Sequence, residues 1–295
     1  MHGVKMPNLS KSYPYFKRIS KKKKALRAYL KRPGIMEGMD TTISPPALEA
    51  HELSRHFGRF QAVKSLNLTV PTGAFFGFLG PNGAGKSTTI KMLTGLLTPS
   101  AGSIRIFGEN FHPQAVALKR KIGVVPEKLH LFEQLSAREY LHFSATMYGV
   151  AKSDIASRSE EILYFMRLED KQHQALADYS HGMRKKIALA AALMHQPRLL
   201  FLDEPFEGLD VVSAKALQQL LKTLTQKGMT IFLTSHILDI VEKLCDHVAM
   251  IQQGELIASA PIETWLHKGS LESHFLEHMG QEPLHSPLSW LTDAS

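Results

Sequence analysis

The chain has 295 residues, 44% of them hydrophobic and 21% charged, which is enough for one large domain or two small ones. Its single cysteine, Cys245, excludes a disulfide framework and fits a reducing compartment. No apolar run reaches the roughly 20 residues that span a bilayer, and the N-terminus lacks the apolar core of a signal peptide. We therefore expect a cytoplasmic chain, free or peripheral to a membrane.

The formal net charge of +8 is concentrated at the N-terminus. Residues 1–40 hold 11 Lys and Arg against two acidic residues, so the remainder is close to neutral and is not expected to bind nucleic acid. We expect residues 1–46 to form a basic extension, partly helical or disordered. Three interpretations stay open: a helix over residues 16–32 that lies on anionic lipid, a solvated tail, and a start codon placed too early, since Met36 or Met39 could also begin the chain.

Strand and helix patterns alternate after this extension. Residues 66–70 and 75–79 predict strands, and the second is entirely apolar, as a buried parallel strand should be. A helix is expected from Lys86. Further strands are predicted at 103–107, 122–125, 199–202 and 230–234, each near a helical stretch, so the core should be an α/β fold with a parallel sheet.

Two other segments are predicted to be helical. Residues 136–196 contain no convincing strand, and we expect an inserted helical subdomain over about residues 128–196. Residues 261–295 are expected to form a C-terminal helical extension beyond a domain that covers residues 47–260.

The glycine-rich stretch GPNGAGKST, residues 80–88, follows the apolar strand. Gly80, Gly83 and Gly85 let the backbone turn tightly enough for its N–H groups to face a phosphate chain. Lys86 adds charge toward the β and γ phosphates, the Ser87 hydroxyl is placed to bind Mg²⁺, and the following helix directs its positive end at the anion. The remaining loop residues expected to contact the nucleotide are Pro81, Asn82, Ala84 and Thr88.

Two carboxylates follow the predicted strand 199–202. Asp203 is expected to hold Mg²⁺ through water. Glu204 is expected to face the opposite way along an extended chain and to polarise a water molecule against the γ phosphate. These features indicate a nucleoside triphosphatase but leave kinase, GTPase and motor interpretations open.

A second glycine turn, YSHGMRKK at residues 179–186, helps to decide among these classes of nucleoside triphosphatase. Helix N-termini normally favour acidic side chains, yet Gly182 is followed by Arg184, Lys185 and Lys186. We expect this basic turn to face an anion rather than a neighbouring residue.

With these motifs in this order, the chain resembles the ATP-binding subunit of an ABC transporter. The resemblance implies a P-loop NTPase core with a mixed, largely parallel sheet, an N-terminal antiparallel β subdomain and the inserted helical subdomain. It implies ATP and Mg²⁺ as cofactors, residues 80–88 as the Walker A motif and Asp203 as the end of the Walker B motif. It also makes Glu204 the catalytic glutamate and His236 a contact of the γ phosphate.

The same resemblance gives the second glycine turn a role in a dimer. It implies that Ser180, Gly182 and Met183, with Asp210 at the end of the D-loop (residues 208–210), contact the nucleotide bound by a second protomer, so that two chains enclose two ATP molecules. Phe57 is similar to the aromatic residue that stacks on adenine, with a core aromatic as the alternative.

Two departures from the commonest family pattern concern the branch of the family. Glu127 stands where many relatives have Gln, and we expect it to bind Mg²⁺ and to act with the catalytic residues. With Glu127, and with His181 and Met183 in the second glycine turn, the chain resembles the branch that mostly exports through separate membrane subunits. We therefore expect an ATP-hydrolysing subunit, a homodimer, on the inner face of the cell membrane and driving an integral-membrane permease. An importer subunit, or a soluble relative acting on ribosomes or DNA, is the alternative.

Overall fold

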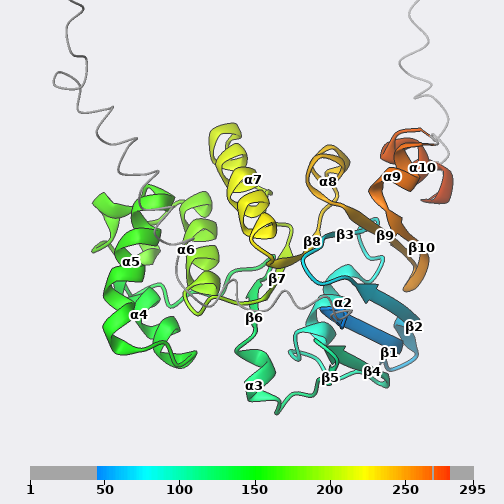
Figure 1. Ribbon diagram of the computed structural model, residues 1–295, viewed down its shortest axis with the longest axis horizontal. Helices are drawn as coiled ribbons and strands as arrows, with labels where there is room; N and C mark the ends of the chain where they lie inside the picture. The colour runs from blue at the N-terminus through cyan, green and yellow to red at the C-terminus, as the bar shows by residue number, and fades with distance from the viewer. Residues whose placement is uncertain (1–44, 268, 280–295) are drawn as a thin grey trace, which may run out of the picture.

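The computed structural model describes residues 45–267 and 269–279. The expected basic extension up to residue 44, with the lipid-binding interpretation of residues 16–32, lies outside the described residues, as does the end of the expected C-terminal extension. Two β-sheets lie beside a separate group of helices (Figure 1). Within the described part of the chain, no helix combines the length and the apolar character needed to cross a membrane.

The first sheet is antiparallel and four-stranded, in the order β2-β1-β4-β5. Its strands are β1 (Leu48–Phe57), β2 (Phe60–Val70), β4 (Ala101–Ile106) and β5 (Glu109–Asn110). The prediction that the strand at 103–107 belongs to the parallel core is therefore wrong. Alternation of buried and exposed residues in β2 and β4 fits a sheet with one face on the core.

The second sheet has six strands in the order β10-β9-β3-β8-β7-β6, all parallel except β10. These strands are β3 (Phe75–Leu79), β6 (Ile122–Val125), β7 (Leu199–Asp203), β8 (Thr230–Thr234), β9 (His247–Gln252) and β10 (Glu255–Pro261). Four of them match strands predicted from the sequence, whereas β9 and β10 were not predicted. The mixed, largely parallel sheet and the antiparallel β subdomain confirm the expected fold class.

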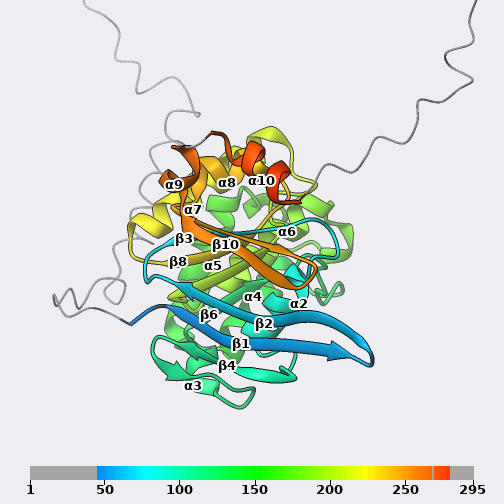
Figure 2. The same cartoon turned by 90° about the vertical axis from the view of Figure 1, so that its right-hand side faces the viewer.

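Helices cover both faces of the six-stranded sheet (Figures 1 and 2). On one face α2 lies between the two sheets, and on the other α7 and α8 pack; α4, α5 and α6 form the helical group beyond β6. The helices are α2 (Lys86–Leu93), α3 (Val116–Lys119), α4 (Ala137–Met147), α5 (Lys152–Met166), α6 (His181–Leu193), α7 (Val211–Gln226), α8 (Leu238–Leu244), α9 (Ile262–Leu266) and α10 (Leu271–Met279).

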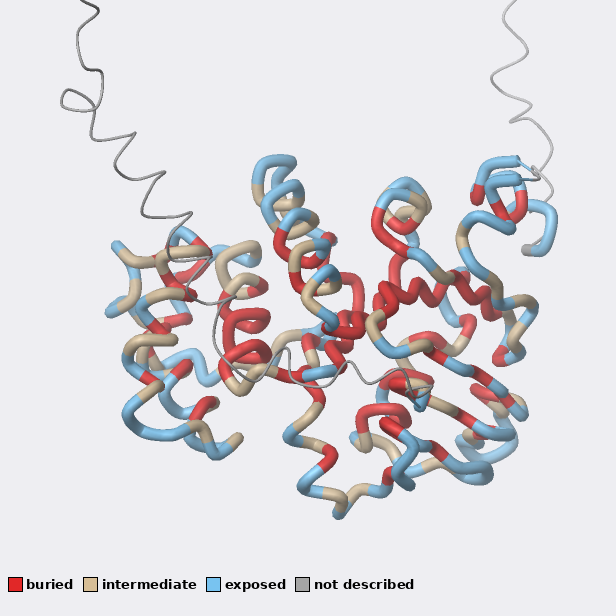
Figure 3. Tube along the Cα trace, in the orientation of Figure 1, coloured by how far each residue is buried: buried red, intermediate tan, exposed pale blue. Residues whose placement is uncertain are grey.

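Apolar side chains on the central strands build the core, which Figure 3 shows as a continuous buried region. Phe76, Phe78 and Phe201 surround Phe232, with ring centroids 5.4 to 5.6 Å from that of Phe232. Every residue of β3, β7 and β8 is buried. Because β3, β6, β7 and β8 run parallel, the loops that follow them leave the sheet at one edge, where ligands bind in folds of this kind.

Candidate nucleotide-binding site

A cavity of about 550 Å³ lies at this edge of the sheet. Five separate stretches of the chain contribute to it: the β1–β2 hairpin, the glycine-rich loop, the loop after β6, the segment at the end of β7 and the loop after β8. The lining residues are Phe60, Ala62, Pro81, Asn82, Gly83, Gly85, Lys86, Ser87, Thr88, Glu127, Asp203, Glu204, Glu207 and His236. The fold thus brings together most of the residues predicted from the glycine-rich loop and from the strand that ends at Asp203. It adds Phe60, Ala62 and Glu207 to the site.

The glycines of the loop serve different purposes. A side chain on Gly80 would place its Cβ 2.3 Å from the carbonyl oxygen of Ile251, and one on Gly85 would come within 2.7 Å of that of Ala62. Gly85 also has a φ of 107°, in the left-handed region. Gly83 has a φ of 80° and open space around it. Gly80 and Gly85 therefore allow the loop to approach β9 and β2, and Gly83 supplies a turn that faces the cavity.

Two residues of the predicted phosphate loop do not line the cavity. Gly80 lies against the backbone of β9, and Ala84 is buried with 2% of its surface exposed. Their role is to fit the loop onto the sheet. The helix that follows has Gly85 at its N-cap, so no side chain there accepts from the first-turn N–H groups, which leaves these groups available to an anion.

Lys86 is almost entirely buried beneath the loop. Its ammonium donates hydrogen bonds to the carbonyl oxygens of Gly80, at 2.6 Å, and Pro81, at 3.1 Å. Burial lowers the pKa of Lys86, and the carboxylates of Glu204, Asp203 and Glu127 oppose that shift. A phosphate chain in the cavity would add negative charge beside this ammonium and favour its charged form.

The hydroxyl of Thr234 connects the two carboxylate residues at the end of β7. It donates to Oδ1 of Asp203 and accepts from the N–H of Glu204 at 3.2 Å. Glu204 has a φ of 48°, so the extended-chain prediction for this residue is wrong. β7 ends at Asp203, and the left-handed turn at Glu204 lets both carboxylates line one cavity.

His236 lies beside Glu204 at the mouth of the cavity. Its Nδ1 atom is 3.0 Å from Oε2 of Glu204; the Glu204 side chain is 11% exposed and that of His236 is 53% exposed. Glu127, in the loop after β6, is exposed and lines the same cavity. A buried carboxylate is therefore in contact with an imidazole that a ligand can reach.

The oxygen ligands present suit Mg²⁺ as it is usually bound beside a nucleotide. No group of three or more His, Cys, Asp and Glu residues in the described ranges is close enough to hold a metal alone. Mg²⁺ however needs only one or two carboxylates when phosphate oxygens and water complete its shell. Ser87, Asp203 and Glu127 line the cavity and supply hydroxyl and carboxylate oxygen.

The second glycine turn lies outside this cavity. Ser180 is exposed and caps α6, its hydroxyl accepting from the N–H of Met183. Gly182 faces the D-loop, since a Cβ there would lie 3.5 Å from Leu209. Asp210 caps α7 by accepting from Ser213, and this hydrogen bond lowers the pKa of Asp210. Two helix N-termini, of α6 and α7, thus meet at one surface.

The expectation that the basic turn faces an anion rather than its neighbours is wrong for two of its three cations. Arg184 pairs with Glu133 at 2.7 Å and donates to the carbonyl oxygens of Tyr179 and Ala177. Lys185 is buried and donates to the carbonyl oxygens of Glu204 and Glu207. The charge run therefore fastens α6 to two loops of its own chain.

Phe57 and Phe60 face each other across the β1–β2 hairpin. Phe57 is 47% exposed, so the core alternative for it is wrong, and the guanidinium of Arg55 lies 4.7 Å from the centre of its ring. Phe60 is 65% exposed and lines the cavity. The sequence HFGRF offered a signal for Phe60, since a glycine turn places flanking residues opposite each other in a hairpin.

The chain is similar to known proteins over most of its length. A family model described as ABC transporter matches residues 63–207. The linearmycin resistance ATP-binding protein LnrL of Bacillus subtilis is 39% identical over 211 residues, covering 72% of this chain and 68% of that protein. The Nod factor export ATP-binding protein I of Cupriavidus metallidurans is 38% identical over 211 residues, covering 72% and 70%. A solved structure described as the ATP-binding subunit of an ABC transporter matches with a TM-score of 0.74 and 30% identity, over 79% of this chain and 100% of that one.

The chain therefore belongs to the ABC transporter family. It is an ATP-binding subunit, an ATPase whose reaction is coupled to transport. The family resemblance, the ATPase activity and the binding of ATP that the motifs predicted are confirmed.

Proposed function

We propose that this subunit binds ATP between two copies of itself and drives export through a separate integral-membrane permease. The observation that carries the proposal is the single cavity shared by the glycine-rich loop, Asp203, Glu204 and His236. Such a site holds a polyphosphate beside a carboxylate that can accept a proton.

Each group in the cavity has a chemical role in this proposal. The N–H groups at the start of α2 and the ammonium of Lys86 bind the β and γ phosphates. Mg²⁺ would be held by Ser87, Asp203 and Glu127 and would neutralise charge on the phosphate oxygens. Glu204 orients the attacking water and accepts its proton, and His236 fixes the Glu204 carboxylate while contacting the γ phosphate.

Phe57 and Phe60 are proposed to hold the adenine at the hairpin tip. Phe60 already lines the cavity, and one face of Phe57 is occupied by Arg55. A ring stacked on the base gives affinity without contributing to the reaction, so replacing it should raise KM rather than lower kcat.

The position of the second glycine turn supports the dimer. Ser180, Gly182, Met183 and Asp210 do not line the cavity of their own chain, yet the helix N-termini beside them favour an anion. In the proposed dimer, this surface closes over the ATP bound by the partner's phosphate loop. Nucleotide then lies between two chains, and hydrolysis removes the bridge between them.

An exposed apolar patch on the helical group is the proposed contact for the permease. Phe132, Phe143 and Met147 are exposed by 55%, 42% and 68%, and the rings of Phe132 and Phe143 meet edge to face at 5.2 Å. Exposed clusters of this kind mark contacts with other proteins. Glu133 next to Phe132 pairs with Arg184, so the patch is joined directly to the helix that begins at the second glycine turn.

The direction of transport follows from the relatives. The Nod factor protein is an export subunit and LnrL a resistance protein by name, and we extend the export direction to this chain. The decisive experiment places the subunit and its co-purified permease in vesicles with the ATP sites outward, where export corresponds to uptake into the vesicle. Lys86→Ala is the control. Transport out of such vesicles would support the importer alternative, and ATPase activity without any co-purifying membrane protein would support a soluble one.

A further inference from the structure

One buried cation joins the helix of the second glycine turn to the segment that carries Glu204. Lys185, in the second turn of α6, is 5% exposed. Its ammonium donates to the carbonyl oxygen of Glu204 at 2.8 Å and to that of Glu207 at 2.6 Å. Burial lowers the pKa of Lys185, and the carboxylates of Glu207, Glu204 and Glu127 oppose the shift.

Hydrogen bonds from two different elements fix the peptide groups on both sides of Glu204. Its N–H is held by Thr234 of β8, and its carbonyl is held by Lys185 of α6. Between these two contacts, the residue adopts a left-handed backbone that non-glycine residues avoid unless their surroundings impose it. Hydrogen bonds elsewhere in this segment are long, with Glu207 N to Glu204 O at 3.4 Å and Leu209 N to Phe206 O at 3.3 Å. Lys185 is therefore a principal restraint on the segment.

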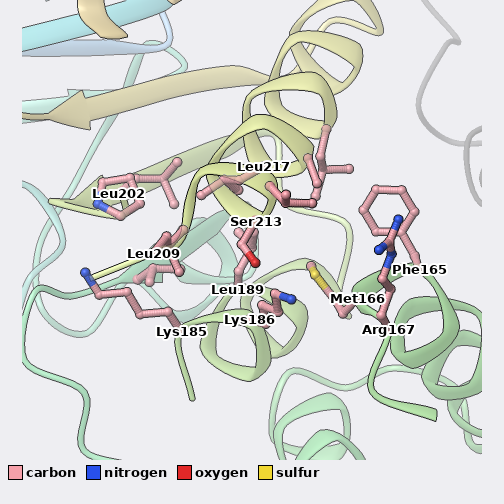
Figure 4. Close-up of a pocket in the computed structure, with 15 residues that line it drawn as sticks. Phe165, Met166, Arg167, Lys185, Lys186, Leu189, Leu202, Leu209, Ser213 and Leu217 are labelled. Carbon is pink, nitrogen blue, oxygen red and sulfur yellow. The ribbon is translucent and has the colours of Figure 1, made fainter. Parts of the chain in front are cut away.

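Open space lies beside Lys185 on the side of α6 that faces α7. A cavity of about 90 Å³ lies between α6, α7 and the end of α5. Figure 4 shows the side chain of Lys185 extending away from Met166 and Arg167, on the far side of this cavity. A movement of α6 meets less resistance beside such a cavity than at a well-packed interface, because close-packed interiors transmit strain through direct contact.

We propose that Lys185 is a positioning residue that makes the orientation of Glu204 depend on the position of α6. This inference rests on the proposed dimer, in which the N-terminus of α6 closes over the partner's nucleotide. Binding of the partner's nucleotide fixes the position of α6. Because Lys185 donates to the carbonyl oxygen of Glu204, the position of α6 in turn determines the backbone position of Glu204. The Glu204 carboxylate is then correctly oriented in the cavity of its own chain. The two ATP sites of the dimer are in this way coupled through one side chain of each protomer.

Steady-state kinetics on three variants test the proposal. Lys185→Met keeps the apolar stem without the charge, Lys185→Arg keeps a cation that can donate to two carbonyls, and Lys215→Met removes an exposed lysine of α7. For Lys185→Met we expect kcat to fall by about tenfold to 100-fold with KM for ATP changed less than about twofold, and the Hill coefficient for ATP to fall toward one. Lys185→Arg should recover most of kcat, since the adjacent cavity leaves room for it, and Lys215→Met should match the wild type.

Hydrogen exchange on the nucleotide-free chain supplies a measurement that does not need hydrolysis. In Lys185→Met, amides of residues 206–210 should exchange faster than in the wild type, while those of β7 and α2 stay unchanged. Unchanged exchange in 206–210, equal acceleration across all of α6, or a rise in KM at constant kcat would each overturn the proposal. A wild-type chain that neither hydrolyses ATP nor dimerises with it would instead contradict the proposed function, and the exchange result would still decide whether Lys185 holds this segment.

Discussion

Oε2 of Glu204 lies 3.0 Å from Nδ1 of His236, and the two residues lie just beyond the ends of the neighbouring strands β7 and β8. Glu204 is nearly buried and His236 is half exposed. A nucleotide in the cavity can therefore contact the imidazole directly and reach the carboxylate through it. Through this pair, a γ phosphate that contacts His236 can influence the Glu204 carboxylate, which accepts the proton from water.

Replacing Glu204 with Gln should separate binding from hydrolysis. The amide fits the same space but cannot accept a proton, so turnover should fall by about 100-fold to 10,000-fold while ATP affinity is retained. The ATP-bound dimer should then accumulate and elute earlier on size exclusion. Hydrolysis at the wild-type rate would rule out Glu204 as the proton acceptor.

Removing the hydroxyl of Thr234 should destabilise the chain as well as slow hydrolysis. Thr234→Val removes the buried hydroxyl that donates to the Asp203 carboxylate and leaves the N–H of Glu204 only the backbone carbonyl of residue 234 as acceptor, at a cost of about 1–3 kcal/mol in the free energy of unfolding. Urea titration with ATPase assays on the same samples measures both effects. Thr146→Val, on the exposed side of α4, is the control and should leave both values near those of the wild type.

The proposed ATP site between two chains can be tested by mixing two defective chains. Lys86→Ala disables the phosphate loop, and Ser180→Arg blocks the exposed N-terminus of α6. In a mixed dimer, one site receives both defects and the other pairs an intact loop with an intact turn, whereas each homodimer has two damaged sites. ATP should therefore join differently tagged chains in the mixture and fail to join either variant alone. Equal association in all three samples would mean that each chain completes its own site.

The start of α4 should lose stability in acid. Ser136 and Glu139 form a capping box in which the Glu139 carboxylate accepts from the Ser136 hydroxyl at 2.7 Å and its N–H at 2.8 Å. The Ser136 side chain and backbone lower the pKa of Glu139 in the folded state, so its contribution to stability is complete above the ordinary pKa of Glu and is lost as pH falls through the lowered value.

Substitution of Glu139 by Gln should reveal this dependence. The variant should be less stable than the wild type at pH 7, and the difference in unfolding midpoint should shrink as the pH is lowered past the pKa of the wild-type carboxyl. Glu272→Gln, at an exposed position of α10, should show no such difference. A gap between wild type and Glu139→Gln that persists in strong acid would assign the stabilisation to something other than the charge.

Much of this architecture was predictable because its signals are local. Residues 75–79 are apolar throughout and 80–88 combine three glycines with Lys86, so strand, loop and helix follow from neighbouring residues alone. The left-handed backbone of Glu204 had no such signal. It depends on Thr234 and Lys185, which are distant in sequence and meet Glu204 only in the folded chain.

The partners of the basic turn were missed for a similar reason. Charge next to Gly182 indicated an anion, but Arg184 and Lys185 have acceptors in loops that the sequence does not place beside α6. Strands β9 and β10 were also missed. β9 is placed in the sheet by pairing with β3, which precedes it by well over a hundred residues, and β10 then pairs with β9.

The strand order also has a consequence for biosynthesis. β8 lies between β3, which leads into the phosphate loop, and β7, which ends at Asp203. Until residues 230–234 leave the ribosome, those two strands have no shared neighbour, and the loop cannot face the carboxylates. Such long-range pairing slows folding, because the loop between the strands must close first. A nascent chain cut before Thr230 thus exposes the open edges of β3 and β7, and ATP can begin to stabilise the subunit only when most of its length has been made.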